Sequence, residues 1–292
     1  MLSASEILQK VRGLEIVSKK LVNTVFTGEY HSTFRGRGML FREVREYHHG
    51  DDTRFIDWNV SARFGHPFSK VFEEERELVV YFLVDISGSA YFGTGSKRKT
   101  DLIAEICAVL AFTAINNKDK AGLVFFSDNI EKFVPAAGGR DHVLYMVREL
   151  ITREPSSTKT DLSVALRYIN RTTRHRSIIF ILSDFLDDGY ESLLKTTSRR
   201  HDITGIKVYD PAELELPDAG LLPMRDMETG QMTWVDSGNE ELRRRYKKSF
   251  FDHLQKTAAI FARAGADLLN CGTGEDYVRI LQQYFIKRIK KH

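Results

Sequence analysis

The sequence predicts an α/β protein with an open, mostly parallel sheet that is flanked by helices and carries a small β-subdomain. From about residue 76 onward, apolar runs of strand length alternate with longer segments of helical period, which is typical of a sheet wrapped by helices. The apolar runs are rich in Val, Ile, Leu and Phe and alternate little, as in strands covered on both faces. A chain of 292 residues with 42% hydrophobic and 28% charged residues is long and apolar enough to bury such a core.

The elements follow from these patterns in chain order. Strands are expected at residues 78–84, 121–126, 177–182, 203–209 and 266–269. Helical spacing of apolar residues is found at residues 99–117, 160–171, 242–264 and 277–285, and Gly265 is placed to end the third of these helices.

Three further segments complete the expected domain organisation. Residues 1–27 show helical spacing, and residues 28–76 are interpreted as a β-subdomain because short runs such as Ile56, Trp58 and Val60 alternate with polar residues. Residues 211–237 contain two short runs around Glu228, Thr229 and Gly230 and predict a hairpin that joins this β-subdomain. Residues 77–210 and 238–292 then form the main α/β domain.

Charge and cysteine content indicate a protein of the reducing cytoplasm. The net charge of +3 is small for this length and does not favour nucleic acid or an anionic membrane as a partner. The N-terminal segment lacks the uninterrupted apolar stretch of a signal peptide or membrane span, so no stable membrane insertion is expected. Cys107 and Cys271 lie far apart in apolar surroundings, which favours buried free thiols over a disulfide.

Polar oxygen-bearing residues gather where three of the predicted elements end or begin. Asp85 ends the first strand of the sheet, and Ser87 and Ser89 follow it in the next loop. Asp184 ends the strand at residues 177–182, and Thr160 precedes a helix. Because ligands of open parallel sheets bind at the carboxyl ends of the strands, we expect these five side chains to converge.

Oxygen-only ligation favours a hard divalent cation, with Mg²⁺ expected first and Mn²⁺ or Ca²⁺ as alternatives. Ser87, Ser89 and Thr160 are expected to contact the ion, while Asp85 and Asp184 act partly through water. One coordination position then stays open for a carboxylate of a partner. Three other interpretations remain: the two aspartates cap helices, the site is a vestige in a scaffold, or Asp85 is the nucleophile of a magnesium-dependent phosphohydrolase or phosphotransferase.

Asp85-x-Ser87-x-Ser89, Thr160 and Ser183-Asp184 together resemble the metal-ion-dependent adhesion site of von Willebrand factor A domains. The resemblance implies a Rossmann-type sheet and a protein-binding rather than catalytic role for residues 76–290. From Gly36 onward the chain also resembles a bacterial family with a von Willebrand factor A-like domain that is known as a domain of unknown function and linked to MoxR-type AAA+ ATPases. Motifs that carry this second resemblance are Arg45-Glu46-Tyr47, Gly50-Asp51-Asp52, Ile56-Asp57-Trp58 and Glu74-Glu75-Arg76.

This second resemblance implies an adaptor or chaperone-like partner of such an ATPase or of its client, which would donate the acidic side chain. Members usually carry Met where this chain has Ala90, a change that leaves the ligand set untouched. A partner surface is expected at Arg45, Tyr47, Asp51, Asp52, Arg54, Asp57, Trp58 and Arg63. The alternative is that these charges form ion pairs that tie the β-subdomain to the sheet.

Two other motifs do not fit the chemistry that they suggest. His48 and His49 lack further His or Cys residues that would complete a zinc set. Residues 93–100, GTGSKRKT, lack the G-x-x-x-x-G-K-[ST] spacing of a phosphate-binding loop. The basic clusters, which lie at residues 171–176, 199–200, 243–248 and 287–291, lack interleaved aromatic residues, so nucleic-acid binding is not expected.

Overall fold

A computed structural model describes residues 9, 11–15, 40–73, 78–95 and 97–289. The chain divides into two compact units, one of residues 34–78 and one of residues 1–33 together with 79–292. Most of the predicted N-terminal helix at residues 1–27 lies outside the described residues. Residue 9 and residues 11–15 of this range are described, and they are helical. Among the described residues, no helix has the length and apolar character that a membrane crossing requires.

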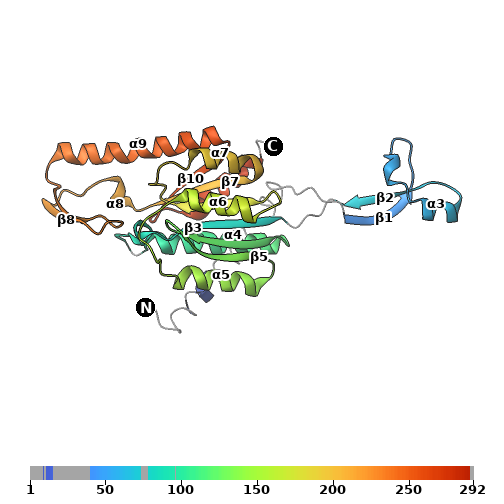
Figure 1. Ribbon diagram of the computed structural model, residues 1–292, viewed down its shortest axis with the longest axis horizontal. Helices are drawn as coiled ribbons and strands as arrows, with labels where there is room; N and C mark the ends of the chain where they lie inside the picture. The colour runs from blue at the N-terminus through green and yellow to red at the C-terminus, as the bar shows by residue number, and fades with distance from the viewer. Residues whose placement is uncertain (1–8, 10, 16–39, 74–77, 96, 290–292) are drawn as a thin grey trace. The chain divides into compact units, whose positions relative to one another are not determined.

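The larger unit is built on a six-stranded sheet (Figure 1), with the strands in the order β10-β7-β6-β3-β4-β5. All neighbouring pairs are parallel except β4 and β5. This confirms the predicted fold class of an open, mostly parallel α/β sheet flanked by helices. The strands are β3 (Val79–Asp85), β4 (Lys120–Phe126), β5 (Ile130–Ala137), β6 (Ile178–Ser183), β7 (Asp202–Tyr209) and β10 (Asp267–Gly272). The sequence patterns predicted each of them except β5.

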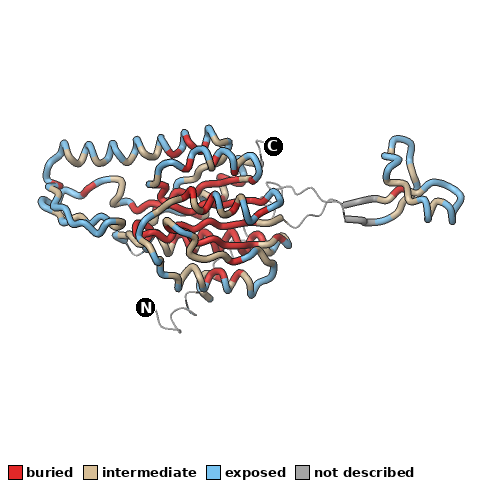
Figure 2. The backbone as a smooth tube through the Cα atoms, viewed as in Figure 1, coloured by how far each residue is buried: buried red, intermediate tan, exposed pale blue. Residues whose placement is uncertain are grey.

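Helices cover both faces of this sheet, and the buried residues run along the central strands (Figure 2). One face packs against α6 (Leu162–Thr172), α7 (Glu191–Arg200) and α9 (Glu240–Ala264). The other face packs against α4 (Lys99–Asn116), α5 (Arg140–Thr152) and α10 (Tyr277–Ile289). Helix α9 ends at Gly265, as predicted, because this residue adopts the left-handed conformation with φ of 73°.

The chain reverses its direction of travel across the sheet at β3. After β3 it adds β4 and β5 on one side, and it then returns to add β6, β7 and β10 on the other. Such a reversal leaves a crevice at the carboxyl ends of the two strands that flank it. Asp85 at the end of β3 and Asp184 just after β6 therefore reach the same edge of the sheet.

A hairpin of β8 (Leu221–Arg225) and β9 (Met232–Asp236) follows the short helix α8 (Pro211–Leu214), as the sequence predicted. The hairpin belongs to the larger unit, so the prediction that it joins the β-subdomain is wrong. Its turn instead contacts a loop of the sheet edge, where Thr158 Oγ1 donates a hydrogen bond to the Glu228 carbonyl over 2.7 Å. The hairpin lies at the left in Figure 1, at the end of the sheet where β3 ends.

The smaller unit has a two-stranded antiparallel sheet of β1 (Leu40–Glu46) and β2 (Phe68–Glu73). A 3₁₀ helix, η2 (Thr53–Phe55), and helix α3 (Trp58–Phe64) connect the two strands. The prediction of β-structure at Ile56, Trp58 and Val60 is wrong for the last two of these residues. Asp57 caps α3 by accepting hydrogen bonds from the Asn59 and Val60 amides, and Gly65 ends it with φ of 76°.

Candidate metal centre

Asp85 is buried and is held by hydrogen bonds from Ser87 and Ser183. Its Oδ1 accepts from the Ser87 amide over 2.9 Å, and its Oδ2 accepts from Ser183 Oγ over 2.7 Å. The Asp85 residue is only 1% exposed to solvent. Burial, followed by the negative charge of Asp184, raises the pKa of Asp85 to about 7. Among the described residues, hydrogen bonds rather than an ion pair hold this carboxyl group.

Ser87 and Ser89 lie where β3 leads into a short 3₁₀ helix, η3 (Gly88–Tyr91). Both residues are buried, and their hydroxyl oxygens lie 3.2 Å apart. Ser87 precedes the helix in an extended conformation, which turns the two side chains to the same side. The Gly88 amide donates to the Thr158 carbonyl over 2.9 Å, and this bond ties the loop to the segment that carries Thr160.

Thr160 supplies a buried hydroxyl that interacts with the carboxyl group of Glu228. Its Oγ1 is shielded from solvent and forms no hydrogen bond of ordinary length among the described residues, but its interaction with Glu228 opposes the rise in the pKa of that carboxyl group. The segment around it is fixed, because the Asp161 amide donates to the Ser127 carbonyl over 3.0 Å and the Asp161 side chain caps α6 at Ser163.

Asp184 follows β6 and is paired with a buried lysine. Lys99 Nζ lies 3.0 Å from Asp184 Oδ2 and 2.7 Å from Glu213 Oε1. Lys207 Nζ donates to the backbone carbonyl of Asp184. Burial disfavours the charged form of Asp184, but the charge of Lys99 and hydrogen bonds from Ser89 and Lys99 outweigh it, so the pKa of Asp184 is lowered.

Neither lysine was predicted as part of the site, although each carries a signal. Lys99 is the first residue of α4, where the helix dipole disfavours a cation unless a carboxylate is near. Lys207 lies between Ile206 and Val208 in the buried part of β7, and burial lowers its pKa to about 8. Ser183 was also missed as a donor to Asp85.

The structure brings the five predicted residues to one edge of the sheet, and their role as metal ligands stays a prediction. The donor set consists of carboxylate and hydroxyl oxygens, which suits a small hard cation. The paired Ser87 and Ser89 hydroxyls beside the buried Asp85 carboxyl group fit such an ion. Lys99 fits less well, since it already neutralises Asp184. Within the described ranges, no group of three or more His, Cys, Asp or Glu residues offers an alternative metal site.

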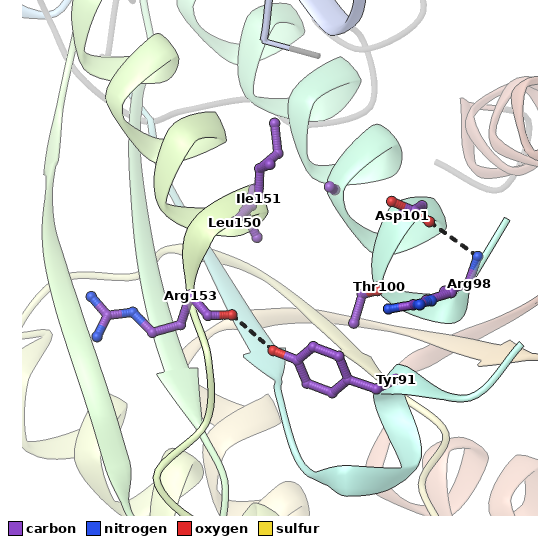
Figure 3. Close-up of a pocket in the computed structure, with 8 residues that line it drawn as sticks. Tyr91, Arg98, Thr100, Asp101, Leu150, Ile151 and Arg153 are labelled. Atoms are coloured by element: carbon purple, nitrogen blue, oxygen red, sulfur yellow. Dashed lines mark hydrogen bonds between the residues drawn. The ribbon is translucent and has the colours of Figure 1, made fainter. Parts of the chain in front are cut away.

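A pocket of about 350 Å³ lies between α4 and α5, near η3 but separate from this site (Figure 3). In it, the Tyr91 hydroxyl donates to the Arg153 carbonyl over 2.8 Å, and the Arg98 amide donates to the Asp101 side chain over 3.1 Å. None of the five candidate ligands lines this pocket.

The predicted partner surface lies on the smaller unit, and its ion pairs are local to that unit. Arg45 pairs with Asp51 at 2.8 Å, Arg54 with Asp52 at 2.5 Å, and Asp57 with Lys70 at 3.5 Å. Ion pairs that water reaches in this way contribute little to stability. Other members of the predicted surface are Tyr47, whose hydroxyl donates to the Asp51 carbonyl, and the exposed residues Trp58 and Arg63. Their role in binding a partner stays a prediction.

Comparison with known proteins identifies the family. The family described as "Protein of unknown function DUF58" matches residues 43–256. "Uncharacterized protein Rv1480" of Mycobacterium tuberculosis is 31% identical over 281 residues, which cover 95% of this chain and 88% of the relative. "Uncharacterized protein Mb1516" of Mycobacterium bovis matches with the same identity and coverage.

Two solved structures resemble this chain at low sequence identity. The conserved hypothetical protein BatB from Bacteroides thetaiotaomicron has a TM-score of 0.49 and 15% identity, and the match covers 74% of this chain and 100% of that one. The SpRpn10 VWA domain has a TM-score of 0.41 and 11% identity, with 71% and 95% covered. Because the family match spans most of the sequence and the mycobacterial relatives align along nearly all of it, this chain belongs to the DUF58 family of proteins of unknown function.

Proposed function

We propose that this chain is a metal-dependent protein-interaction module that binds Mg²⁺ through Asp85, Ser87, Ser89, Thr160 and Asp184 and presents the ion to an acidic side chain of a partner. The observation that carries the proposal is the pair of buried Ser87 and Ser89 hydroxyls, whose oxygens lie 3.2 Å apart beside the buried Asp85 carboxyl group at one sheet edge. Burial raises the pKa of Asp85 to about 7, and a divalent cation would stabilise the charged form of this carboxyl group.

The protein groups around this site have distinct parts in holding the ion. The hydroxyls of Ser87, Ser89 and Thr160 would contact the ion directly, and the fixed loops keep them in place before it binds. The Ser183 hydroxyl and the Ser87 amide orient Asp85, and Lys99 orients Asp184. Mn²⁺ and Ca²⁺ suit the same oxygen donors.

The partner that fits this chemistry donates a carboxylate to the cation. From the family resemblance, we propose a MoxR-type AAA+ ATPase or its client, met in the cytoplasm and bound without catalysis. The exposed ring of Trp58 on the smaller unit, with 71% of its surface accessible, offers a second contact for such a partner.

Capture from native lysate tests the proposed function. Tagged wild-type protein is expected to retain its partner in Mg²⁺ and to release it in EDTA, and Asp85→Ala is expected to capture none. Asp252→Ala, which changes an exposed carboxylate of α9, serves as the matched control and is expected to behave as wild type. Capture that is unaffected by EDTA and by Asp85→Ala in a folded protein contradicts the proposal.

One observation favours a second candidate, a scaffold whose site holds its shape without a metal. The ammonium group of Lys99 already lies between Asp184 and Glu213, as a permanent internal cation. A scaffold of this kind gains no stability from Mg²⁺, whereas a cation-binding module does, because a ligand that binds only the folded state raises the unfolding temperature.

A further inference from the structure

The β8–β9 hairpin has one face that is half-buried and one that is exposed. Residues that lie directly opposite each other in an antiparallel pair point to the same side of the sheet. Three such pairs form the exposed face, which we call the outer face: Leu221 and Asp236, Pro223 and Trp234, and Arg225 and Met232. All six residues are exposed, whereas Leu222, Met224 and Val235 on the other face are half-buried.

The outer face is apolar over most of its length. Leu221, Met232 and Trp234 are 67%, 61% and 69% exposed, and Pro223 lies opposite Trp234. Exposed apolar side chains that gather on one surface are typical of protein-binding sites, and Trp is among the residues that contribute most to binding energy. The outer face therefore has the composition of a docking surface.

The turn of this hairpin borders the candidate metal centre. A Cβ atom on Gly88 would lie 2.3 Å from the Met227 carbonyl oxygen, so the turn touches the Ser87–Ser89 loop. The Thr158 hydroxyl donates to the Glu228 carbonyl over 2.7 Å, which joins the turn to the segment that leads to Thr160. A partner on the outer face is thus placed next to the candidate ligands.

Two cationic side chains near the turn form no ion pair within the described part of the chain. Arg225 lies on the outer face, at the end of β8 next to the turn. Lys159 lies between Thr158, which contacts the turn, and Thr160. Both residues are exposed, so their charges are available to a partner.

The acidic side chains of the hairpin are held by hydrogen bonds within the chain. Asp226 Oδ1 accepts from the amides of Glu228 and Thr229 over 2.8 and 3.1 Å. Asp236 Oδ1 accepts from the Gly238 amide over 3.0 Å. The charges that these contacts leave without a partner are positive, which favours an acidic occupant of the outer face.

We propose that the outer face is the docking surface of the partner and that it takes a segment in which apolar and acidic side chains alternate. The apolar side chains cover Trp234 and Met232, and the acidic ones pair with Arg225 and Lys159. The inference rests on the proposed function, because the same partner donates a carboxylate to the cation beside the turn. It deepens that function by naming the surface and the chemistry of the segment that binds there.

Fluorescence anisotropy with a fluorescein-labelled peptide in which Glu and Leu alternate tests this proposal on the full chain. The peptide is expected to bind in Mg²⁺. Trp234→Ser and Met232→Ser are each expected to weaken binding about tenfold, as loss of a central apolar contact does. Ile286→Ser, which changes an exposed apolar residue of α10, is the matched control and should bind as wild type does.

The contribution of charge is tested with the same peptide. Arg225→Glu is expected to weaken binding about tenfold, because it brings like charges together. Lys195→Glu, which changes an exposed lysine of α7, is the control and should have no effect. Peptides in which Lys replaces Glu or Ser replaces Leu are expected not to bind. Circular dichroism verifies that each variant is folded.

The outcomes separate the docking surface from the proposed function. If the peptide binds in Mg²⁺ and the Trp234, Met232 and Arg225 variants bind it as tightly as wild type, the docking surface is refuted and the metal-dependent interaction stands. If these variants lose the peptide while EDTA has no effect, the docking surface stands and the metal dependence fails.

Three further results refute an acidic, apolar occupant. They are the absence of binding by the Glu-Leu peptide, preferred binding of the Lys-Leu peptide, and a wild-type dimer in sedimentation that Trp234→Ser dissociates. In the last case a second copy of this chain covers the outer face. The response of the unfolding temperature to Mg²⁺ then decides separately whether the proposed cation site exists.

Discussion

Replacing Lys99 by Met removes the internal cation of the sheet edge while keeping most of its apolar stem. The Lys99 residue is 1% exposed, and its ammonium group lies 3.0 Å from Asp184 and 2.7 Å from Glu213. In Lys99→Met these two carboxylates lose their shared partner. Asp184 is itself buried, so water cannot replace the lost interaction there.

The size of the effect follows from this burial. Removing one partner of a buried ion pair costs about 3–5 kcal/mol, because the other charge stays buried without compensation. The Glu213 side chain is 21% exposed and recovers part of its hydration, which places the expected loss near the lower end, at about 3 kcal/mol. Lys97→Met provides the matched control. Lys97 pairs with Glu105 at 2.8 Å but is 45% exposed, and we expect a loss of about 0–1 kcal/mol.

Urea unfolding followed by circular dichroism, in EDTA, measures both losses as free energies of unfolding. Adding Mg²⁺ is then expected to stabilise Lys99→Met more than wild type, because the ion no longer competes with the lysine for Asp184. A loss below about 1 kcal/mol for Lys99→Met, equal to that for Lys97→Met, refutes the argument that Lys99 compensates a buried charge.

Three further predictions concern stability and reactivity. Gly88→Ala pushes a Cβ atom against the Met227 carbonyl and is expected to lower the free energy of unfolding by about 1–3 kcal/mol. The control Gly95→Ala, at a position with open space, is expected to leave this free energy unchanged. Equal effects of the two variants in urea unfolding would disprove the close approach at Gly88. Burial lowers the pKa of His201 to about 4, so the unfolded state, with an ordinary His pKa near 6.5, binds more protons between these values. The contribution of His201 to the free energy of unfolding is therefore fully present above pH 6.5 and falls by about 3 kcal/mol as the pH drops to 4. The free energy of unfolding of His201→Gln should depend less steeply on pH over this range. Burial raises the pKa of Cys107, and that of Cys271 to about 12, so iodoacetamide should modify neither thiol before the chain unfolds, and rapid labelling of the native protein contradicts this burial.

The sequence predicted the sheet well because its strands are buried on both faces. Residues such as Phe82, Leu123 and Phe180 are fully buried, and their apolar runs are unambiguous. Strand β5 escaped prediction because it is an edge strand, in which polar residues such as Glu131 and Lys132 interrupt the apolar pattern. In the smaller unit, the alternating apolar residues Ile56, Trp58 and Val60 suggested a strand. Trp58 and Val60 instead lie in helix α3, because Asp57 caps the start of this helix.

The candidate site was predictable where its residues follow a strand or, as for Thr160, precede a helix. Asp85 and Asp184 stand at the ends of apolar runs, and strand order places them at one edge. Lys99, Lys207 and Glu228 approach that edge from a helix, a neighbouring strand and a distant hairpin. Contacts of this kind depend on how elements pack in three dimensions, and no spacing in the sequence records them.

The most direct test of the central claim is the thermal unfolding of the wild-type chain with and without Mg²⁺. At a free Mg²⁺ concentration about 100 times its Kd, folded-state binding contributes about 2.7 kcal/mol, which raises the Tm of a chain of this size by roughly 4 °C. Thr160→Val, which removes the buried hydroxyl, should lose most of this rise, and Thr196→Val on the exposed side of α7 should keep it. A wild-type Tm that does not respond to Mg²⁺, Mn²⁺ or Ca²⁺ contradicts the claim that this sheet edge binds a cation.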